Sequence, residues 1–309
     1  MTARVPAVGI IGAGAVGQAV GGALVAAGLC DRLLVTARAA GQAAALADDL
    51  DDMRTALGSP VRPCPAEAAE LRETAAVVIA VRARFANTLS ADVRMGGAQA
   101  NAPVIRALAA DLAGYRGTVL MVTNPVDVMT RLFAEKSGCP RVFGIGSGLD
   151  SARYRLALAR LLDVPTSAVS GHVIGEHGDA AVVCASSTTV HGHPVPVPLQ
   201  QVRDELTARP GRINAGIGRT RCGPAGVVAS TLRLACGVED GTTELSVRHK
   251  DVWLGIPVHF TQGRFLPFVP ALDAAEARQL KAARSKLRAA YAAVRGVPPQ
   301  PLLSGRTHS

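Results

Sequence analysis

The fold of this chain is decided by residues 8–17, which read VGIIGAGAVG. The first four residues form an apolar run that predicts a buried strand, and glycines spaced as G-x-G-x-x-G follow it directly. Beyond them, Val16, Val20 and Leu24 share one face of a predicted helix. A strand, a glycine-rich turn and a helix in this order predict the start of a parallel sheet wrapped by helices.

The glycines of this turn predict a dinucleotide-binding site. Gly12 permits the tight turn, Gly14 lets backbone amides approach a pyrophosphate, and Gly17 lets the helix pack close to the sheet. Ala15 and Val16 begin the helix, whose N-terminus adds positive potential. The alternative is a glycine-rich turn without a ligand.

Strands recur through the first half of the chain and alternate with alanine-rich helical segments. We expect them at residues 33–36, 77–81 and 119–123. This alternation predicts an α/β fold with a doubly wound parallel sheet, and we assign residues 1–145 to this dinucleotide-binding domain.

A different pattern after about residue 145 predicts a second, α+β domain over residues 146–297. Its expected elements are a helix at 150–162, strand-like runs at 169–174 and 181–190, strands near 252–260 and a charged helix at about 273–294. We expect residues 298–309 to form a loose tail.

The end of the second strand bears on the choice of dinucleotide. Proteins that bind NAD usually carry an acidic residue here, which accepts hydrogen bonds from the adenosine ribose. This chain reads Ala37-Arg38 instead, which removes the carboxylate and places a guanidinium nearby. We therefore predict NADP(H) as the cofactor. If Arg38 is only a solvated surface side chain, the cofactor is NAD(H).

Three further segments carry residues suited to chemistry. The segment GEHGD at 175–179 places His177 at the end of a strand-like run, where a proton donor and acceptor near neutral pH would suit carbonyl reduction. The segment VTNPVD at 122–127 places Asn124 at the carboxyl end of a strand, where open α/β sheets bind ligands. A lone histidine can also be purely structural.

The third segment, LDSAR at 149–153, opens a predicted helix. Asp150 and Arg153 are three residues apart and therefore share a face. An aspartate can orient an imidazole, and an arginine can grip a carboxylate with two parallel hydrogen bonds. Alternatively, Asp150 only stabilises the first turn and Arg153 is a surface charge.

Together, the segments GAGAVG, VTNPVD, GLDSARYR and GEHGD resemble the L-lactate and malate dehydrogenase family in order and spacing, from about residue 8 to 294. The resemblance implies a Rossmann-type domain, a homodimer or homotetramer, and nicotinamide-dependent interconversion of a 2-oxo acid and an L-2-hydroxy acid. It implies that His177 is the general acid/base, Asp150 its partner, Arg153 the carboxylate clamp and Asn124 the nicotinamide-side contact. Arg94, seven residues before Asn101, takes the place of the family's loop arginine, which polarises the carbonyl.

The chain departs from the family after the third strand. Residues 80–84 read AVRAR where relatives have a Thr-Ala-Gly turn, so Val81 and Arg82 are expected beside the cofactor and Arg84 near the substrate. Malate dehydrogenases carry a second loop arginine, and counting back from Arg94 gives Leu89 at that place. We therefore do not expect malate as the substrate.

The opposite wall of the expected pocket leaves the substrate's side chain open. Gly223 would leave space for a bulky group. Arg82, Arg84 and Arg221 could instead face the pocket and suit a phosphonate, sulfonate or carboxylate.

Composition argues against other partners. The net charge is +9, but the arginines are spread along the chain and aromatic residues make up only 3%, which does not suit nucleic-acid binding. No apolar run approaches the ~20 residues that cross a bilayer, and the six cysteines are scattered without metal-ligand spacing. We expect a cytoplasmic enzyme without a metal. The competing hypotheses are an imine or amino-acid type reductase and a non-catalytic dinucleotide-binding sensor; the presence of His177, Asp150 and Arg153 argues against the sensor.

Overall fold

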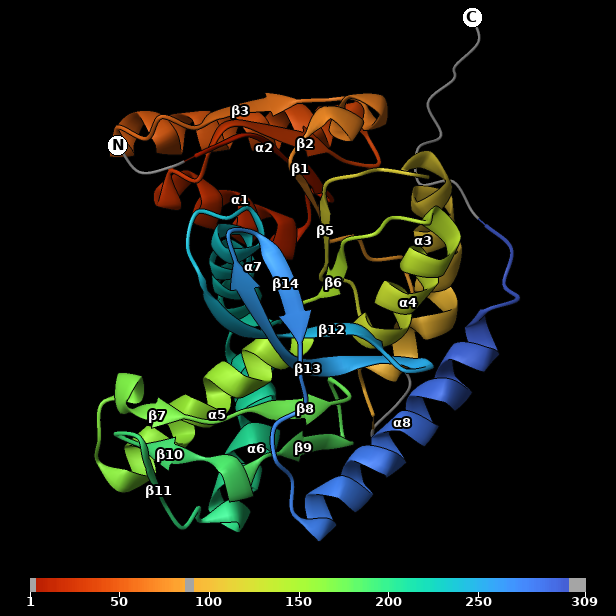
Figure 1. The fold of residues 1–309 in the computed structure, drawn as a ribbon. Helices are drawn as coiled ribbons and strands as arrows, with labels where there is room; N and C mark the ends of the chain where they lie inside the picture. The colour runs from red at the N-terminus through yellow and green to blue at the C-terminus, as the bar shows by residue number, and fades with distance from the viewer. Residues whose placement is uncertain (1–3, 87–91, 300–309) are drawn as a thin grey trace, which may run out of the picture.

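The computed structural model describes residues 4–86 and 92–299 of the 309-residue chain. Its first half is a parallel sheet in the order β3-β2-β1-β4-β5-β6, with helices on both faces (Figure 1). The elements are β1 (Val5–Ile11), α1 (Ala15–Ala27), β2 (Cys30–Thr36), α2 (Ala40–Leu57), β3 (Arg62–Pro65), β4 (Ala76–Ile79), α3 (Ala98–Asp111), β5 (Thr118–Met121), α4 (Val126–Ser137) and β6 (Val142–Gly144). The predicted doubly wound sheet is confirmed.

The second half adds antiparallel strands to the same sheet. Beyond β6 the order continues β12-β13-β8-β9, and a separate small sheet has the order β11-β10-β7. The elements are α5 (Gly146–Leu162), β7 (Val169–Ser170), β8 (Val173–Gly175), β9 (Ala181–Val183), β10 (Thr189–Val190), β11 (His193–Pro194), α6 (Leu199–Ile217), α7 (Cys222–Ala235), β12 (Gly241–His249), β13 (Val252–Thr261), β14 (Arg264–Pro267) and α8 (Ala274–Val294). A single residue pair, Ser246 with Gly144, joins β12 to β6.

Some expected elements differ from the observed ones. The run at 169–174 divides into β7 and β8, which belong to different sheets, and the run at 181–190 divides into β9 and β10. Helix α5 begins at Gly146, so Asp150 lies in its second turn rather than at its start. No strand was expected at β12, although it pairs with β13 along its whole length.

The parallel strands are buried on both faces, which explains their continuous apolar sequence. In β1, Val8 and Ile10 are fully buried, and one apolar core extends from them into β13 and α8. A smaller cluster around Tyr154 and Leu158 lies beneath the small sheet. Within the described residues, no helix combines the length and apolar character that crossing a membrane requires.

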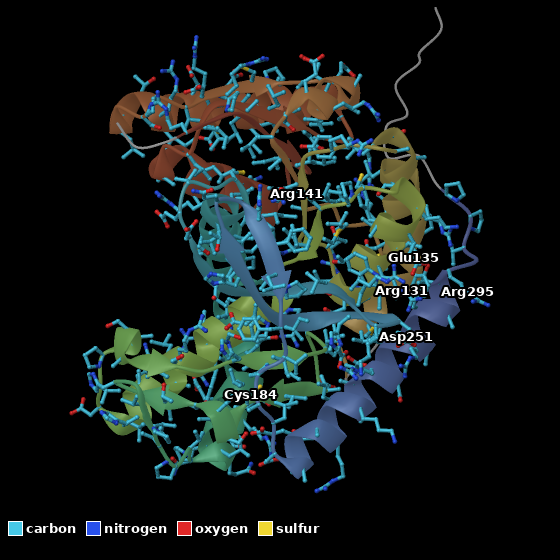
Figure 2. The ribbon with its side chains drawn as sticks, in the orientation of Figure 1. Arg131, Glu135, Arg141, Cys184, Asp251 and Arg295 are labelled. Carbon is cyan, nitrogen blue, oxygen red and sulfur yellow. The ribbon has the colours of Figure 1, made fainter. Side chains whose placement is uncertain are left out.

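Helix α8 crosses the outside of the antiparallel strands and reaches α4 and α3 (Figure 1). Its capping box, Asp273 with Glu276, fixes its first turn. Near its other end, the Arg131 guanidinium of α4 stacks over the Tyr291 ring at 3.8 Å, and the Tyr291 hydroxyl donates to Glu135. Figure 2 shows Arg131 and Glu135 beside this helix. Both ends of α8 are therefore held.

Candidate active site

The glycine-rich turn has the shape that a pyrophosphate requires. Gly12 has a φ of 117°, and a side chain there would meet the Ala80 carbonyl at 2.7 Å. A Cβ at Gly17 would lie 1.7 Å from the Gly12 oxygen, whereas the space around Gly14 is open within 4 Å. Helix α1 has no side-chain cap and no acid in its first turn, so its first amides can bind phosphate oxygens. The residues from Gly12 to Gly17 therefore fit a dinucleotide.

The end of β2 lies next to this turn. The Gly12 amide donates to the Thr36 carbonyl at 2.8 Å. Ala37 is buried, and Arg38 is exposed just before α2. Arg38 therefore comes two residues after Thr36, whose carbonyl is hydrogen-bonded to the glycine-rich turn.

The segment after β4 lies on the other side of the same turn. Val81 is buried, and its carbonyl accepts a hydrogen bond from the Thr123 hydroxyl at 2.8 Å. Arg82 is exposed and lies 4.6 Å from the Phe85 ring in a cation–π contact, and Arg84 is exposed as well. Leu89 lies outside the described residues.

Asn101 joins the two loops at the carboxyl edge of the sheet. This buried side chain donates to the Asn124 carbonyl at 2.7 Å and accepts from the Ala83 amide at 2.8 Å. Asn124 precedes a cis peptide bond to Pro125. The loops that follow β4 and β5 are therefore held together beside the cofactor turn.

His177 lies at the centre of the site and is held on three sides. Its Nδ1 lies 2.6 Å from Asp150 Oδ2, and its amide donates to Asp127 Oδ2 at 2.8 Å. Its ring packs against Gly146, where an added Cβ would lie 2.4 Å from the ring. The contact with Asp150 assigns Nε2 to the open side, where it can exchange a proton with a ligand.

Arg153 completes a buried triad of polar side chains with Asp150 and His177. Its Nη1 lies 3.9 Å from Asp150 Oδ1, and it is only 7% exposed. Burial alone would raise the pKa of Asp150, but the charge and hydrogen bond of His177, together with Arg94 and Arg153, hold that pKa below its ordinary value. Asp150 therefore stays ionised and orients the imidazole.

Two further arginines act on this triad. Burial lowers the pKa of Arg153, and the charges of Arg94 and Arg209 lower it further against the effect of Asp150. The expected loop arginine, Arg94, is thus within electrostatic range of both Asp150 and Arg153. Arg209 was not found from the sequence. It lies on α6, which packs against α5, and pairs with Glu205 at 3.2 Å.

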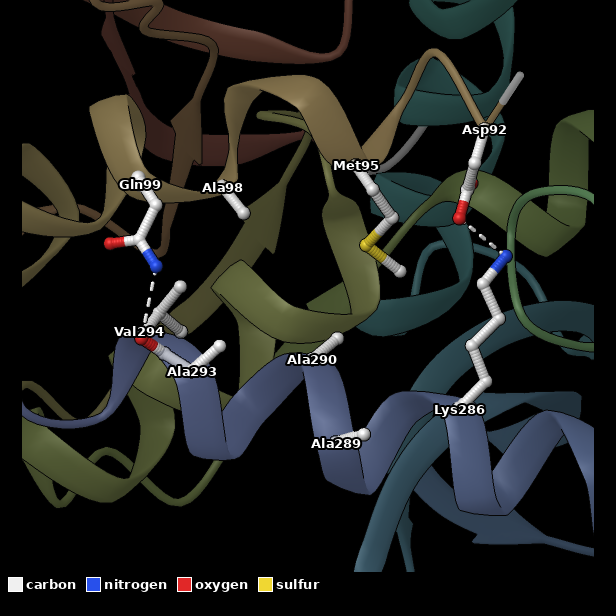
Figure 3. Close-up of a pocket in the computed structure, with 9 residues that line it drawn as sticks. All are labelled: Asp92, Met95, Ala98, Gln99, Lys286, Ala289, Ala290, Ala293 and Val294. Carbon is white, nitrogen blue, oxygen red and sulfur yellow. Dashed lines mark hydrogen bonds and ion pairs between the residues drawn. The ribbon is translucent and has the colours of Figure 1, made fainter. Parts of the chain in front are cut away.

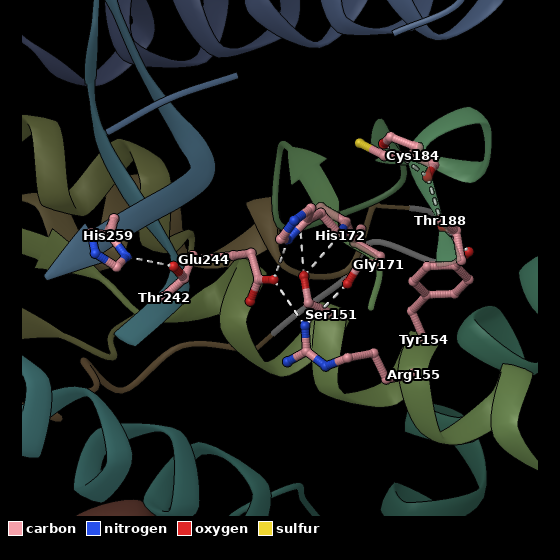
Figure 4. A network of polar contacts seen from close by, with 12 residues as sticks. Ser151, Tyr154, Arg155, Gly171, His172, Cys184, Thr188, Thr242, Glu244 and His259 are labelled. Carbon is pink, nitrogen blue, oxygen red and sulfur yellow. Dashed lines mark hydrogen bonds and ion pairs between the residues drawn. The ribbon is translucent and has the colours of Figure 1, made fainter. Parts of the chain in front are cut away.

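A polar network holds α5 against β8, the strand that precedes His177, and against β12. Ser151 is next to Asp150 in sequence, and its hydroxyl accepts from the Val173 amide at 2.9 Å. Buried Glu244 of β12 accepts from Arg155 Nη1 at 2.9 Å and contacts His172 Nδ1 at 2.7 Å (Figure 4). The side chains of Asp150 and Arg153 are therefore presented from a fixed helix.

Leu149 lies beside Gly223, which we expected to leave space for the substrate. A Cβ at Gly223 would lie 2.9 Å from Leu149 Cδ1, so this leucine borders that space. Among the described residues, no group of three or more His, Cys, Asp or Glu side chains is placed to hold a metal ion.

The sequence did not reveal the roles of two other residues of the site. Gly146 is an ordinary helix residue in sequence, and Asp127 belongs to a recognised segment but contacts His177 from 50 residues away. Their roles follow from the way that α5, α4 and β8 meet.

Comparisons with known proteins point to a single family. The family model for the lactate/malate dehydrogenase NAD binding domain matches residues 7–144, and the model for the lactate/malate dehydrogenase alpha/beta C-terminal domain matches residues 147–209. An L-lactate dehydrogenase of Zea mays is 31% identical over 202 residues, which cover 64% of this chain and 56% of that protein. An L-2-hydroxycarboxylate dehydrogenase (NAD(P)(+)) of Methanocaldococcus jannaschii is 31% identical over 182 residues, 53% of this chain and 58% of that protein. The matched regions thus span less than two thirds of these relatives.

Solved structures share the fold over nearly the whole chain. The minor L-lactate dehydrogenase of Enterococcus mundtii has a TM-score of 0.87 at 24% identity, covering 96% of this chain and 100% of that chain. The malate dehydrogenase of Cryptosporidium parvum has a TM-score of 0.84 at 23% identity, covering 95% and 99%. Because the two family models together match residues 7–144 and 147–209, this chain belongs to the lactate/malate dehydrogenase family.

Proposed function

We propose that this chain is a nicotinamide-dependent dehydrogenase that interconverts a 2-oxo acid and an L-2-hydroxy acid. One observation carries the proposal. His177 Nδ1 is bonded to the buried carboxylate of Asp150 at 2.6 Å, with Arg153 on the other oxygen of the same carboxylate. The arrangement pairs a proton donor, His177, with a group that can bind a substrate carboxylate, Arg153, at the edge of a dinucleotide site. Relatives named L-lactate and L-2-hydroxycarboxylate dehydrogenases support it.

The residues divide the chemistry between them. The reduced nicotinamide, when bound, supplies the hydride that adds to the carbonyl carbon. Arg153 binds the substrate carboxylate and Arg94 polarises the carbonyl oxygen. His177 Nε2 donates the proton that this oxygen takes up, and Asp150 stabilises the doubly protonated imidazole before that transfer. In the oxidation of the hydroxy acid, His177 accepts the same proton.

The cofactor is proposed to be NADP(H), with NAD(H) as the alternative. Arg38 supports this preference because it follows the β2 residue bonded to Gly12, and residues 37–39 contain no acid. A guanidinium there would form charge-assisted hydrogen bonds with a 2′-phosphate.

The substrate is proposed to carry a second anionic group on its side chain. The charges of Arg94 and Arg209 both act on Arg153 at this site, while Asp150 is already engaged with His177 and Glu205 with Arg209. Leu149 Cδ1 would lie 2.9 Å from a Cβ at Gly223, which weakens the argument for a bulky apolar group at this wall. The excess positive charge favours a carboxylate, phosphonate or sulfonate.

A single assay tests these proposals. Oxidation of NADPH and of NADH is followed optically with 2-oxo acids whose side chains are small, bulky and apolar, or anionic, oxaloacetate included. We expect turnover with NADPH and an anionic acid. Oxaloacetate should react little although it is anionic, because Leu89 takes the place of the second loop arginine of malate dehydrogenases. Turnover that requires an added amine would indicate an imine reductase. Cofactor binding without turnover of any acid would indicate a sensor.

We also propose a cytoplasmic homodimer or homotetramer. Phe265, Leu266 and Phe268, on or beside edge strand β14, are 37%, 68% and 39% exposed, which supports association. Light scattering after size exclusion would give the mass, and a monomer would contradict this proposal.

A further inference from the structure

A single lysine joins two segments of the active site that are far apart in sequence. Lys286 Nζ, on α8, lies 2.7 Å from Asp92 Oδ2 and 2.8 Å from Glu176 Oε2. Figure 3 shows Lys286 reaching across a groove toward Asp92, beside Met95 and Ala290. Asp92 comes two residues before Arg94, and Glu176 immediately precedes His177.

The Glu176 side of this contact is deeply buried. Glu176 is 1% exposed, and its Oε2 also accepts from the Ala180 amide at 2.9 Å. A Cβ at Gly178 would lie 2.5 Å from Glu176 Oε1, so the glycine that follows His177 makes room for this carboxylate. A buried carboxylate that stays ionised is costly unless it is paired, and Lys286 supplies a positive charge at this one.

The Asp92 side of the contact fixes the turn that carries Arg94. The Asp92 amide donates to Asp179 Oδ2 at 3.0 Å, and its carbonyl accepts from the Met95 amide at 2.9 Å. Asp92 is thus held at both its backbone and its side chain. Arg94 lies within this turn and acts on Asp150 and Arg153.

Helix α8 is anchored by contacts with α3 and α4 near its C-terminal end. Beyond Lys286, the Ala293 carbonyl accepts from Gln99 Nε2 of α3 at 3.0 Å, and Tyr291 is clamped by Arg131 and Glu135 of α4. The ammonium group is therefore presented from a helix that is anchored to the dinucleotide-binding half.

We propose that Lys286 is a positioning residue, which holds the Arg94 turn in register with the His177 strand end by bridging Asp92 and Glu176. Its effect on turnover rests on the function proposed above: the carbonyl must meet the Arg94 guanidinium and the His177 imidazole together. A lone surface ion pair would contribute little. This one differs because one of its carboxylates is buried and both flank the reacting groups.

The deciding variant is Asp92→Asn, because it replaces the ion pair between the turn and Lys286 by at most a neutral hydrogen bond and leaves the buried Lys286–Glu176 pair intact. We expect kcat for the 2-oxo acid to fall about tenfold to a hundredfold with little change in KM, because Arg94 acts in the transition state. The Kd for NADPH should not change. Lys286→Met should give a similar loss, and adding Asp92→Asn to it should lower kcat no further. Lys286→Arg should restore most of the activity.

A readout that needs no substrate separates this proposal from the proposed function. Amide hydrogen exchange over residues 92–97 should be faster in Asp92→Asn and Lys286→Met than in the wild type. The matched control is Lys281→Met, an exposed lysine on the same helix, which should change neither exchange nor kcat. If Lys286→Met does not fold, Asp92→Asn alone decides the question.

The outcomes are distinct. Wild-type exchange over residues 92–97 together with wild-type kcat in Asp92→Asn would overturn the role of Lys286. Faster exchange in an enzyme whose wild type reduces no 2-oxo acid would support the contact and overturn the proposed function. Faster exchange with unchanged kcat would show that the turn does not position Arg94 for the reaction, and this too would overturn the proposal.

Discussion

The buried carboxyl of Asp127 gives a quantitative prediction about stability. Asp127 is 3% exposed, and burial above all raises its pKa from 3.8 to about 6, against its bond to the His177 amide. A difference of about two units between the pKa values in the folded and unfolded states corresponds to about 3 kcal/mol in the free energy of unfolding. The folded protein therefore holds the Asp127 proton more tightly than the unfolded chain does.

The direction in which pH changes the stability follows from this tighter proton binding. Stability from the protonated carboxyl is fully present below pH 3.8, the ordinary pKa, and is lost as the pH rises through about 6. Asp127→Asn has no proton to lose and keeps an oxygen that accepts the His177 amide. At pH 7.5 this variant should be more stable than the wild type by up to about 3 kcal/mol, or about 5 °C in Tm.

Thermal unfolding from pH 4.5 to 8 measures this difference. The gap between variant and wild type should shrink steadily below pH 6. Asp111→Asn, which removes an exposed acid at the end of α3, is the control and should leave Tm nearly unchanged at every pH. If Asp127→Asn melts below the wild type at pH 7.5, the ionised carboxylate stabilises the fold through its hydrogen bonds and the reasoning from burial is wrong.

Three further predictions concern the site. His177→Asn should lower kcat by about 10² to 10⁴ and leave the Kd for NADPH within about twofold, measured by stopped-flow turnover and fluorescence titration; near-normal turnover would remove His177 from the mechanism. Arg38→Asp should raise KM for NADPH by about tenfold to a hundredfold and lower KM for NADH. An unchanged ratio of the two steady-state KM values would mean that Arg38 does not contact the cofactor. Gly17→Ala should abolish NADPH binding in a fluorescence titration, because its Cβ would lie 1.7 Å from the Gly12 oxygen, while Gly22→Ala on the same helix, with only ordinary contacts to Met53, should bind normally.

The first half of the fold could be predicted from sequence because its rules are local. The glycine turn, β1 and α1 follow one another within 20 residues of Gly12, and the apolar runs of buried parallel strands are easy to identify. The second half could not be predicted as well. The run at 169–174 reads VSGHVI, and its two ends pair with strands of different sheets, which no local pattern indicates.

In the candidate site, too, residues in local motifs could be predicted from the sequence and residues brought together by packing could not. His177, Asp150 and Arg153 stand in recognisable segments, and the structure brings them within contact distance. Lys286 carries no such signal, because its partner Glu176 is 110 residues away and a lysine on a charged helix reads as solvated surface. Only the packing of α8 against β9 and α4 reveals its role.

The single pairing of β12 with β6 has a consequence for synthesis on the ribosome. All six parallel strands lie within residues 5–144, so the dinucleotide-binding half can complete its sheet while the rest is still being translated. The hairpin of β12 and β13 emerges about a hundred residues later and must find β6 as an exposed edge. During that interval β6 is open to pairing with other nascent chains. Truncations that end before Gly241 should therefore aggregate through this edge, whereas chains extending past Thr261 should not.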